Sequence, residues 1–321
     1  MPNRMPHFSV IMPLYNKAPY VRKAVESVVG QTYTDWELVV VDNGSTDGSG
    51  EVVAGFSDAR IQMVRLADNI GPGGARNRGV TESSASWICF LDADDWWEST
   101  FLEEMAGLIE RHPDAGIYGT GYYIVKSGKK RLAPIGVEEG FGEGEIDYCK
   151  VYAKTLCMPL TSISVAMPRG IFEECGGFKT HLRLGEDFDL WIRIALKHRT
   201  VLLNKPLSNY NQEVAVTYRG THHLRAPEEH MLWNLDYLEP VEQTNPDYKQ
   251  LIDNLRTYSL YLYLLDRRYR EAARRELRKV DWSRQPKKTR RLYRQPLWCL
   301  SLTLRGRKLG SKIKQALLKY V

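Results

Sequence analysis

The stretch Glu37-Leu-Val-Val-Val-Asp42-Asn-Gly-Ser-Thr-Asp47 carries the pattern that decides the fold. Its β-branched run predicts a buried strand, and the cluster of turn formers after it predicts a tight turn. Similar apolar runs occur at Phe8–Met12, Ile61–Leu66 and Trp87–Leu91. Helical patterns separate the runs, with apolar residues at three- and four-residue spacing. The alternation predicts right-handed βαβ crossovers and a mostly parallel sheet flanked by helices.

Polar residues stand where each expected strand ends. Asn16 follows the first strand, Asp42 ends the second, Asp68-Asn69 follows the third, and Asp92 follows the fourth. The carboxyl ends of parallel strands lie at one edge of a sheet, and ligands bind there. We therefore expect one site assembled from these ends.

The bulk composition is that of a globular protein. The 321 residues are 43% hydrophobic, 26% charged and 11% aromatic, and the length exceeds one average domain. No apolar run reaches the roughly 20 residues that span a bilayer, and no signal-peptide pattern precedes Phe8. We therefore expect a soluble or peripheral protein of the cytoplasm. A disulfide framework or zinc site is not expected from five scattered cysteines without a CxxC pair: Cys89, Cys149, Cys157, Cys175 and Cys299.

Charge divides the chain unevenly. The net charge is +6, but residues 284–321 contain twelve Lys or Arg and no Asp or Glu, which leaves −6 for residues 1–283. The same segment carries an apolar stripe at helical spacing, Leu309, Ile313, Leu317 and Leu318. Basic amphipathic helices of this kind bind anionic membrane surfaces. The alternatives are a solvated helix covering the catalytic domain and a nucleic-acid patch. The apolar stripe and the acidic body favour the membrane and no nucleic acid.

Three parts follow from these patterns. Residues 1–223 form an α/β catalytic domain, residues 224–283 a wholly helical extension, and residues 284–321 a membrane-association segment. We expect the protein on the inner face of the plasma membrane.

The cluster Asp92-Ala-Asp94-Asp95 is the first candidate for chemistry. Carboxylates at i and i+2 on a tight turn can hold Mn²⁺ or Mg²⁺, with phosphate oxygens completing the shell. A lone Asp-x-Asp is often only a solvated turn. The position at a strand end, and Trp96-Trp97 directly after it, favour a functional role.

Two further segments suit a nucleotide. Asp42 can accept hydrogen bonds from a base or ribose, although an Asp before Asn-Gly is often a turn residue. Gly71-Pro-Gly-Gly-Ala-Arg76 places glycines and an arginine at a helix start, which suits a diphosphate and equally suits a simple helix cap.

The segment Gly185-Glu186-Asp187-Phe-Asp189-Leu-Trp191 is the second acidic centre. Its carboxylates and tryptophan fit a general base beside a sugar-stacking ring, and they also fit acidic residues capping a helix. His222 is a candidate for a metal shell, or one of two exposed surface histidines.

Six ordered motifs resemble the family 2 glycosyltransferases, which are inverting enzymes with a GT-A fold. The resemblance covers residues 7–200, on these segments: Phe8–Asn16, Gln31-Thr-Tyr, Glu37–Asp47, Asn69-Ile-Gly with Ala75-Arg76-Asn77, Leu91–Asp95 and Gly185-Glu186-Asp187.

The resemblance implies a metal-dependent transfer of a sugar from a nucleoside-diphosphate donor to a saccharide or lipid-linked saccharide, with a UDP-sugar favoured. Asp187 would be the catalytic base, Glu186 and Trp191 would face the acceptor, and Asp94 with His222 would hold the metal. The donor would contact Pro13, Tyr15, Asn16, Asp42, Asn69, Gly71, Arg76 and Asp92.

Two other readings remain open. A nucleotidyltransferase uses a related sheet, but its first loop is rich in glycine and lysine, whereas this one reads Pro13-Leu-Tyr-Asn-Lys-Ala. The other reading is an inactive, membrane-bound partner of the same fold, which Asp94 and Asp187 argue against.

Overall fold

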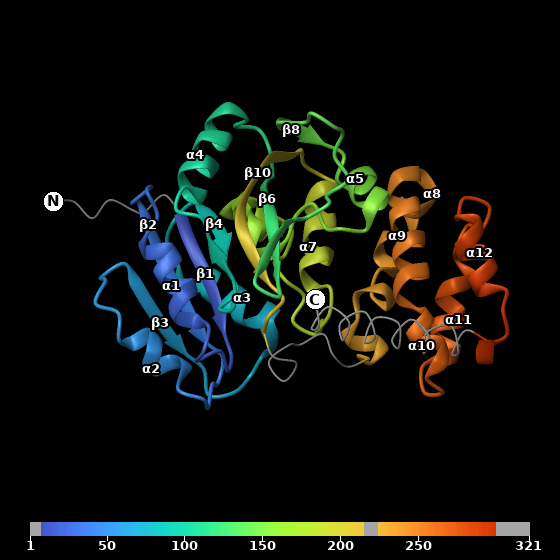
Figure 1. Cartoon of the computed structure of the whole chain (residues 1–321), viewed down its shortest axis with the longest axis horizontal. Helices are drawn as coiled ribbons and strands as arrows, with labels where there is room; N and C mark the ends of the chain where they lie inside the picture. The colour runs from blue at the N-terminus through green and yellow to red at the C-terminus, as the bar shows by residue number, and fades with distance from the viewer. Residues whose placement is uncertain (1–7, 215–223, 300–321) are drawn as a thin grey trace, which may run out of the picture. The chain divides into compact units, whose positions relative to one another are not determined.

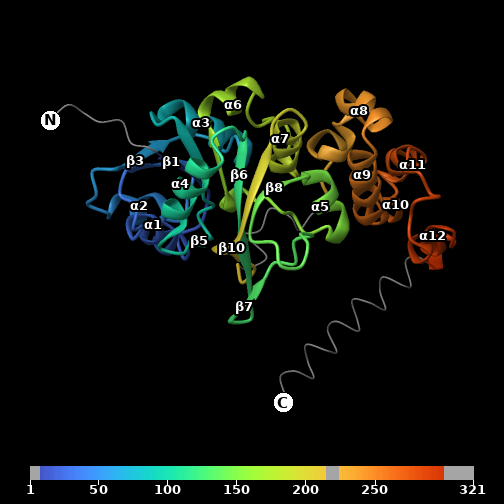
Figure 2. The same cartoon turned by 90° about the horizontal axis from the view of Figure 1, so that it is seen from above.

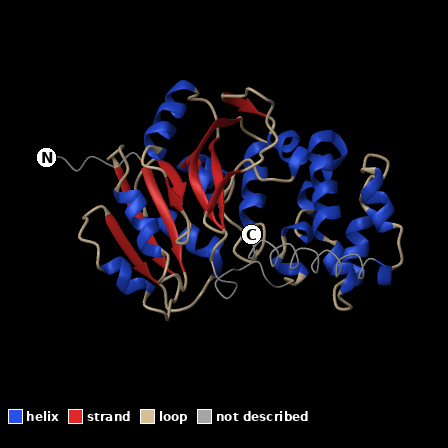
Figure 3. Cartoon of the chain, viewed as in Figure 1, coloured by secondary structure: helices blue, strands red, loops and turns tan. Residues whose placement is uncertain are grey.

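The computed structural model describes residues 8–214 and 224–299, and the chain divides into two compact units, Met1–Leu235 and Asp236–Val321. All described strands belong to the first unit, and the described part of the second is helical (Figure 3). The first unit extends beyond the boundary expected at residue 223. Residues after the gap are bonded back to it, since Arg183 N–H donates to the Glu229 carbonyl at 2.8 Å.

A ten-stranded sheet forms the frame of the first unit (Figure 1). Its strands run in the order β3-β2-β1-β4-β9-β6-β10-β5, with β7 paired to β6 and β8 paired to β10. Their bounds are β1 Phe8–Leu14, β2 Trp36–Asp42, β3 Ile61–Arg65, β4 Trp87–Phe90, β5 Trp96–Trp97, β6 Ile117–Lys126, β7 Lys129–Leu132, β8 Glu143–Ile146, β9 Val165–Pro168 and β10 Thr200–Asn211.

The expected parallel pairing is confirmed for β1 to β4, and the sheet as a whole is mixed. Strands β3, β2, β1 and β4 pair in parallel, and so do β6 and β10. Strand β9 is antiparallel to both β4 and β6, so it joins two blocks that run in the same direction. Strand β9 begins at Val165, because Ser162–Ser164 before it forms a 3₁₀ turn.

Helices cover both faces of the sheet (Figure 2). Alternation along β1 assigns the faces: Val10 and Met12 belong to the core under α1 and α4, whereas Ile11 points to α3. The helices of this unit are α1 Val21–Val29, α2 Ser49–Ala54, α3 Gly71–Glu82, α4 Phe101–Arg111, α5 Tyr148–Thr155, α6 Arg169–Glu174 and α7 Glu186–Ala195.

The second unit is built around a buried arginine. Arg256 is 1% exposed, and its guanidinium meets Glu242 at 2.7 Å and both Asp253 and Glu276 at 3.4 Å. Within residues 8–214 and 224–299, no helix is both long and apolar enough to cross a bilayer. The helices of this unit are α8 Glu239–Thr244, α9 Pro246–Ser259, α10 Tyr261–Leu265, α11 Arg270–Arg278 and α12 Lys287–Tyr293.

Close packing of α3 on the sheet generates the first prediction. A Cβ on Gly79 would lie 2.4 Å from Cγ2 of Ile11, inside contact distance. We expect Gly79→Ala to lower the free energy of unfolding by about 1–3 kcal/mol, although alanine normally stabilises a helix over glycine. Urea denaturation measures the change. Gly170→Ala is the matched control, because nothing lies within 4 Å of a Cβ there and its effect should be neutral or stabilising. A Gly79→Ala protein as stable as this control would contradict the packing.

Candidate active site

The strand ends meet at one edge of the sheet, as the sequence predicts. Asn43 N–H, just after β2, donates to the Leu14 carbonyl at the end of β1 at 2.8 Å. At the end of β10, the Asn211 side chain donates to the Asp94 carbonyl at 3.1 Å. These bonds bring the ends of β1, β2 and β10 together with the turn after β4.

The loop after β2 is held by two residues expected to bind a nucleotide. Asn16, at φ +50°, accepts from Thr46 N–H at 2.8 Å, and Asp42 accepts from Ser45 N–H at 3.0 Å. Asp42 is buried, so this carboxylate supports the loop. Tyr15 is 45% exposed and Pro13 is half-buried, so the tyrosine ring is free to stack on a planar group.

Asn43 braces the edge of the site, and the sequence analysis leaves it unassigned. Its side chain donates to Asn69 Oδ1 at 3.0 Å and accepts from Ile70 N–H at 2.9 Å. Asn69 in turn accepts from Gly71 N–H at 2.8 Å. This brace fixes the start of α3. The sequence pattern predicts only a turn at the Asn-Gly pair that contains Asn43.

The acidic turn after β4 concentrates negative charge. Lys17, also unassigned by the sequence reading, donates to Asp94 Oδ2 at 2.5 Å. Burial raises the pKa of Asp94 above its usual range, opposed by Lys17. Burial and the neighbouring Asp94 raise the pKa of Asp95 still further, while Asp95 accepts from Asn211 N–H at 2.6 Å. The turn is therefore short of positive charge.

Arg76, which the sequence predicts as a donor-binding residue, lies at the centre of a buried ion pair. It is 4% exposed, and its two terminal nitrogens donate to Asp92 at 2.7 Å and to Glu186 at 3.0 Å. The two carboxylates raise its pKa against the effect of burial. Because a helix position 110 residues away supplies Glu186, the sequence pattern did not reveal this role.

Asp187 lies beside this ion pair. Burial and the adjacent Glu186 raise its pKa to about 6, and Arg76 opposes the shift. The helix-capping alternative does not account for the pair, since Gly185 is the N-cap and Glu186 turns to Arg76. A carboxylate with a pKa near the working pH suits a general base.

Trp191 does not face the acceptor, contrary to the expectation from the sequence. The ring is fully buried and packs against Phe90 and Phe178, with centroids 6.2 and 5.8 Å away. Its place in the core leaves no face for stacking on a saccharide. Tryptophan one turn into an amphipathic helix has the same spacing whether it faces ligand or core, so the sequence alone did not separate the two.

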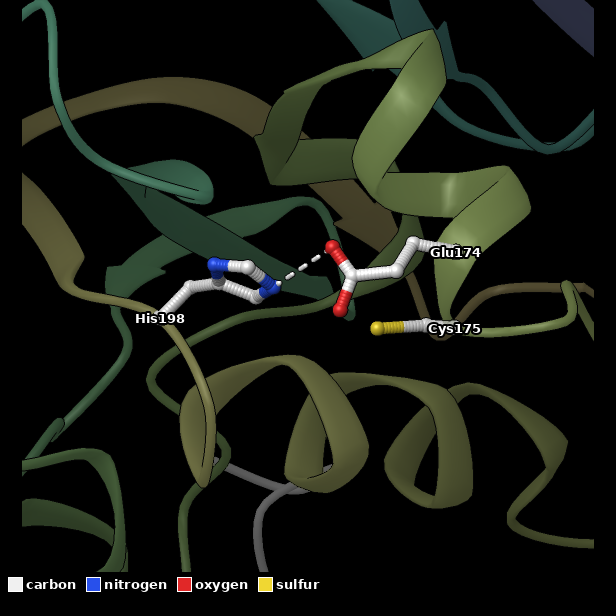
Figure 4. Close-up of side chains that lie close together, drawn as sticks. All are labelled: Glu174, Cys175 and His198. Carbon is white, nitrogen blue, oxygen red and sulfur yellow. Dashed lines mark ion pairs between the residues drawn. The ribbon is translucent and has the colours of Figure 1, made fainter.

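The proposed metal ligand His222 lies outside the described residues. Within the described chain, one group of three potential ligands was found, Glu174, Cys175 and His198 (Figure 4). It lies before β10, at the sheet edge opposite Asp94. His198 is 3.3 Å from Glu174, and Lys197 also pairs with that carboxylate, so ordinary ion pairs explain the cluster.

Comparisons with known proteins agree with this geometry. Residues 9–164 match the profile described as glycosyl transferase family 2. The chain is 30% identical over 246 residues to amylovoran biosynthesis glycosyltransferase AmsB of Erwinia amylovora, covering 73% of this chain and 78% of that protein. It is 36% identical over 119 residues to UDP-Glc:alpha-D-GlcNAc-diphosphoundecaprenol beta-1,3-glucosyltransferase WfgD of Escherichia coli, covering 37% of this chain and 47% of that protein.

Solved structures share the fold. S. aureus TarS 1–349 in complex with UDP-GlcNAc aligns over 84% of this chain and 70% of its own, with TM-score 0.60 and 18% identity. Mannosyltransferase PcManGT from Pyrobaculum calidifontis, in complex with GDP-Man and Mn²⁺, aligns over 96% of this chain and 81% of its own, with TM-score 0.54 and 20% identity.

The sheet has the GT-A fold that these solved structures share. The chain belongs to glycosyltransferase family 2. The enzyme class expected from the sequence is thereby confirmed.

The buried Arg76 generates a prediction about stability. Arg76→Met leaves two carboxylates without their cation, and we expect the free energy of unfolding to fall by about 3–5 kcal/mol in fluorescence-monitored urea denaturation. Arg78 on the same helix is the control: it is half-exposed and pairs with Glu82 at the surface, so Arg78→Met should change stability by less than about 0.5 kcal/mol. Similar effects of the two substitutions would refute the role of Arg76.

Proposed function

We propose that the enzyme transfers a sugar, with inversion, from a nucleoside-diphosphate donor to a hydroxyl of a saccharide or lipid-linked saccharide in polysaccharide biosynthesis. The observation that carries the proposal is Asp187, an acid of raised pKa joined through Glu186 and Arg76 to the acidic turn. The names of AmsB and WfgD support polysaccharide chemistry and a diphosphate-linked acceptor. The nucleotide in TarS supports a UDP-sugar.

Few groups of the protein take part in the chemical step. Asp187 removes the proton of the acceptor hydroxyl as its oxygen bonds to the anomeric carbon. The bond from that carbon to the diphosphate oxygen breaks on the opposite face, and the nucleoside diphosphate departs with the electron pair. A single displacement of this kind inverts the anomeric configuration. Arg76 holds Glu186 and Asp92 in place, so the base and the acidic turn keep a fixed separation.

The acidic turn fits a hard divalent cation. Its carboxylates are crowded and short of positive charge, which is the donor set that Mn²⁺ or Mg²⁺ prefers. Asp94 and the half-buried Asp92 would hold the ion, with Asp94 exchanging Lys17 for it, and His222 remains a candidate third ligand. A bound cation would neutralise charge on the departing diphosphate. The Mn²⁺ in the related PcManGT structure supports this choice.

The direct test of the function is a product assay. Purified enzyme with Mn²⁺ and a panel of labelled nucleotide sugars should release nucleoside diphosphate. A nucleotidyltransferase would release pyrophosphate instead. A protein that releases neither product with any donor would match the inactive partner.

The raised pKa of Asp187 predicts a pH profile. The base form is lost as pH falls through about 6, so kcat/KM, which reports the free enzyme, should decline below that value, whereas an ordinary aspartate would remain ionised to about pH 4. Asp187→Asn should lower kcat about 10²-fold or more while nucleoside diphosphate affinity, measured by calorimetry, is retained.

Because folding raises the pKa of Asp187, its ionised form opposes folding at neutral pH, so the Asn variant should melt at the same or a higher temperature. Equal losses of rate and affinity would contradict the base.

Metal dependence is tested at Asp94. Asp94→Asn should lower the Mn²⁺-stimulated rate at least about 10²-fold, because the ion supplies several kcal/mol of charge stabilisation. The exposed Asp114, outside the acidic turn, supplies the control Asp114→Asn, which should keep the wild-type response. Unchanged rates of Asp94→Asn in chelator-treated buffer would exclude the metal assignment.

We also propose that the basic C-terminal part holds the enzyme on the anionic inner face of the plasma membrane. Helix α12 displays exposed cations and no acidic residue, and Trp298 after it is 67% exposed. Tyr293 donates to the Thr257 carbonyl at 2.7 Å, which anchors α12 to α9. The expected amphipathic stripe from Leu309 onward lies outside the described residues.

Charge removal tests membrane binding without disturbing that anchor. Replacing Lys287, Lys288, Arg291 and Arg294 by glutamine should weaken binding to anionic vesicles about 10²-fold or more at low salt, at about 1 kcal/mol per charge. The control removes four exposed cations of the first unit, Lys126, Lys129, Arg131 and Arg199. Vesicle sedimentation that responds equally to both sets would refute a specific membrane-binding segment.

A further inference from the structure

Arg183 has a fixed backbone position at the active-site edge. It precedes Glu186 in the loop that leads into α7. Its N–H donates to the Glu229 carbonyl at 2.8 Å, and the next residue, Leu184, accepts from Met231 N–H at 3.1 Å. The loop is therefore bonded to a second segment on either side of the Arg183 side chain.

The guanidinium of Arg183 rests on the bare Cα of Gly71. A Cβ on Gly71 would lie 1.4 Å from Nη1 and 2.6 Å from Cζ of Arg183, so only glycine permits this approach. Gly71 has φ +86°, and the Asn43–Asn69 brace bonds both its N–H and its carbonyl. The surface under the guanidinium is thus rigid.

Within residues 8–214 and 224–299, no carboxylate forms an ion pair with Arg183, which distinguishes it from the other two cations of the site. Arg76 is bound by two carboxylates, and Lys17 is bound by Asp94. The Arg183 side chain is half-buried against Gly71, so its donors suit an anion supplied by a ligand.

We propose that Arg183 binds a phosphate group of a substrate through its guanidinium. This inference rests on the proposed function, in which phosphate reaches the site in the donor diphosphate or in a lipid-linked, diphosphate-bearing acceptor. Planar guanidinium donors match two phosphate oxygens at once, whereas a neutral saccharide offers no charge to pair with. Arg183 would position that phosphate beside Gly71, four residues before Asp187 at the start of α7.

The test compares Arg183→Gln and Arg183→Lys with Arg78→Gln, a half-exposed arginine on α3 as matched control. Calorimetry measures binding of UDP and of inorganic pyrophosphate, and steady-state kinetics measures KM for donor and acceptor. We expect Arg183→Gln to weaken phosphate binding on the order of 10- to 100-fold, with partial retention in Arg183→Lys. A loss for UDP assigns the donor phosphate. A rise confined to acceptor KM assigns the acceptor phosphate.

Gly71→Ala provides an independent variant. Its methyl group would displace the guanidinium, so it should weaken phosphate binding in the wild type and add little in the Arg183→Gln background. Thermal melts identify any variant that is simply unfolded. Unchanged affinity and unchanged KM in Arg183→Gln would overturn the proposal while leaving the transferase function standing. Arg183-dependent pyrophosphate binding by a wild-type protein without transfer would refute the function and keep the phosphate site.

Discussion

The guanidinium of Arg76 is the interaction on which the active site depends. One side chain from α3 holds Asp92 at the end of β4 and Glu186 at the start of α7, so it joins two segments far apart in sequence. Burial makes each of these charges unfavourable alone and mutually stabilising together. The separation of the acidic turn from Asp187 therefore depends on a structural ion pair.

The charged side chains at this edge of the sheet have different roles. Lys17 and Arg76 neutralise carboxylates within the protein, whereas Arg183 is proposed to bind a phosphate of the substrate. Asp187 is only partly compensated, and its pKa rises to about 6 as a result. An acid in that range is ionised at neutral pH and still basic enough to accept a proton. An ion pair for every carboxylate at this edge would have made the fold more stable and Asp187 a weaker base.

Charged residues are arranged differently in the second unit. Its core is organised by Arg256 and three acidic residues, while the surface of α12 is basic and faces no acidic partner on its own helix. Positive charge confined to this part of the chain suits the proposed binding to an anionic surface. The proposed localisation thus follows from charge distribution along the chain.

Residue patterns were enough to predict the parallel strands β1 to β4, the helices between them and the acidic turn after β4, because apolar periodicity and turn chemistry are local properties of the chain. The buried ion pair of Arg76, the place of Trp191 in the core and the raised pKa of Asp187 became visible in the folded protein. Those properties depend on which distant residue lies alongside and on how much water is excluded. Neither the distant neighbour nor the exclusion of water can be inferred from residue spacing along the chain.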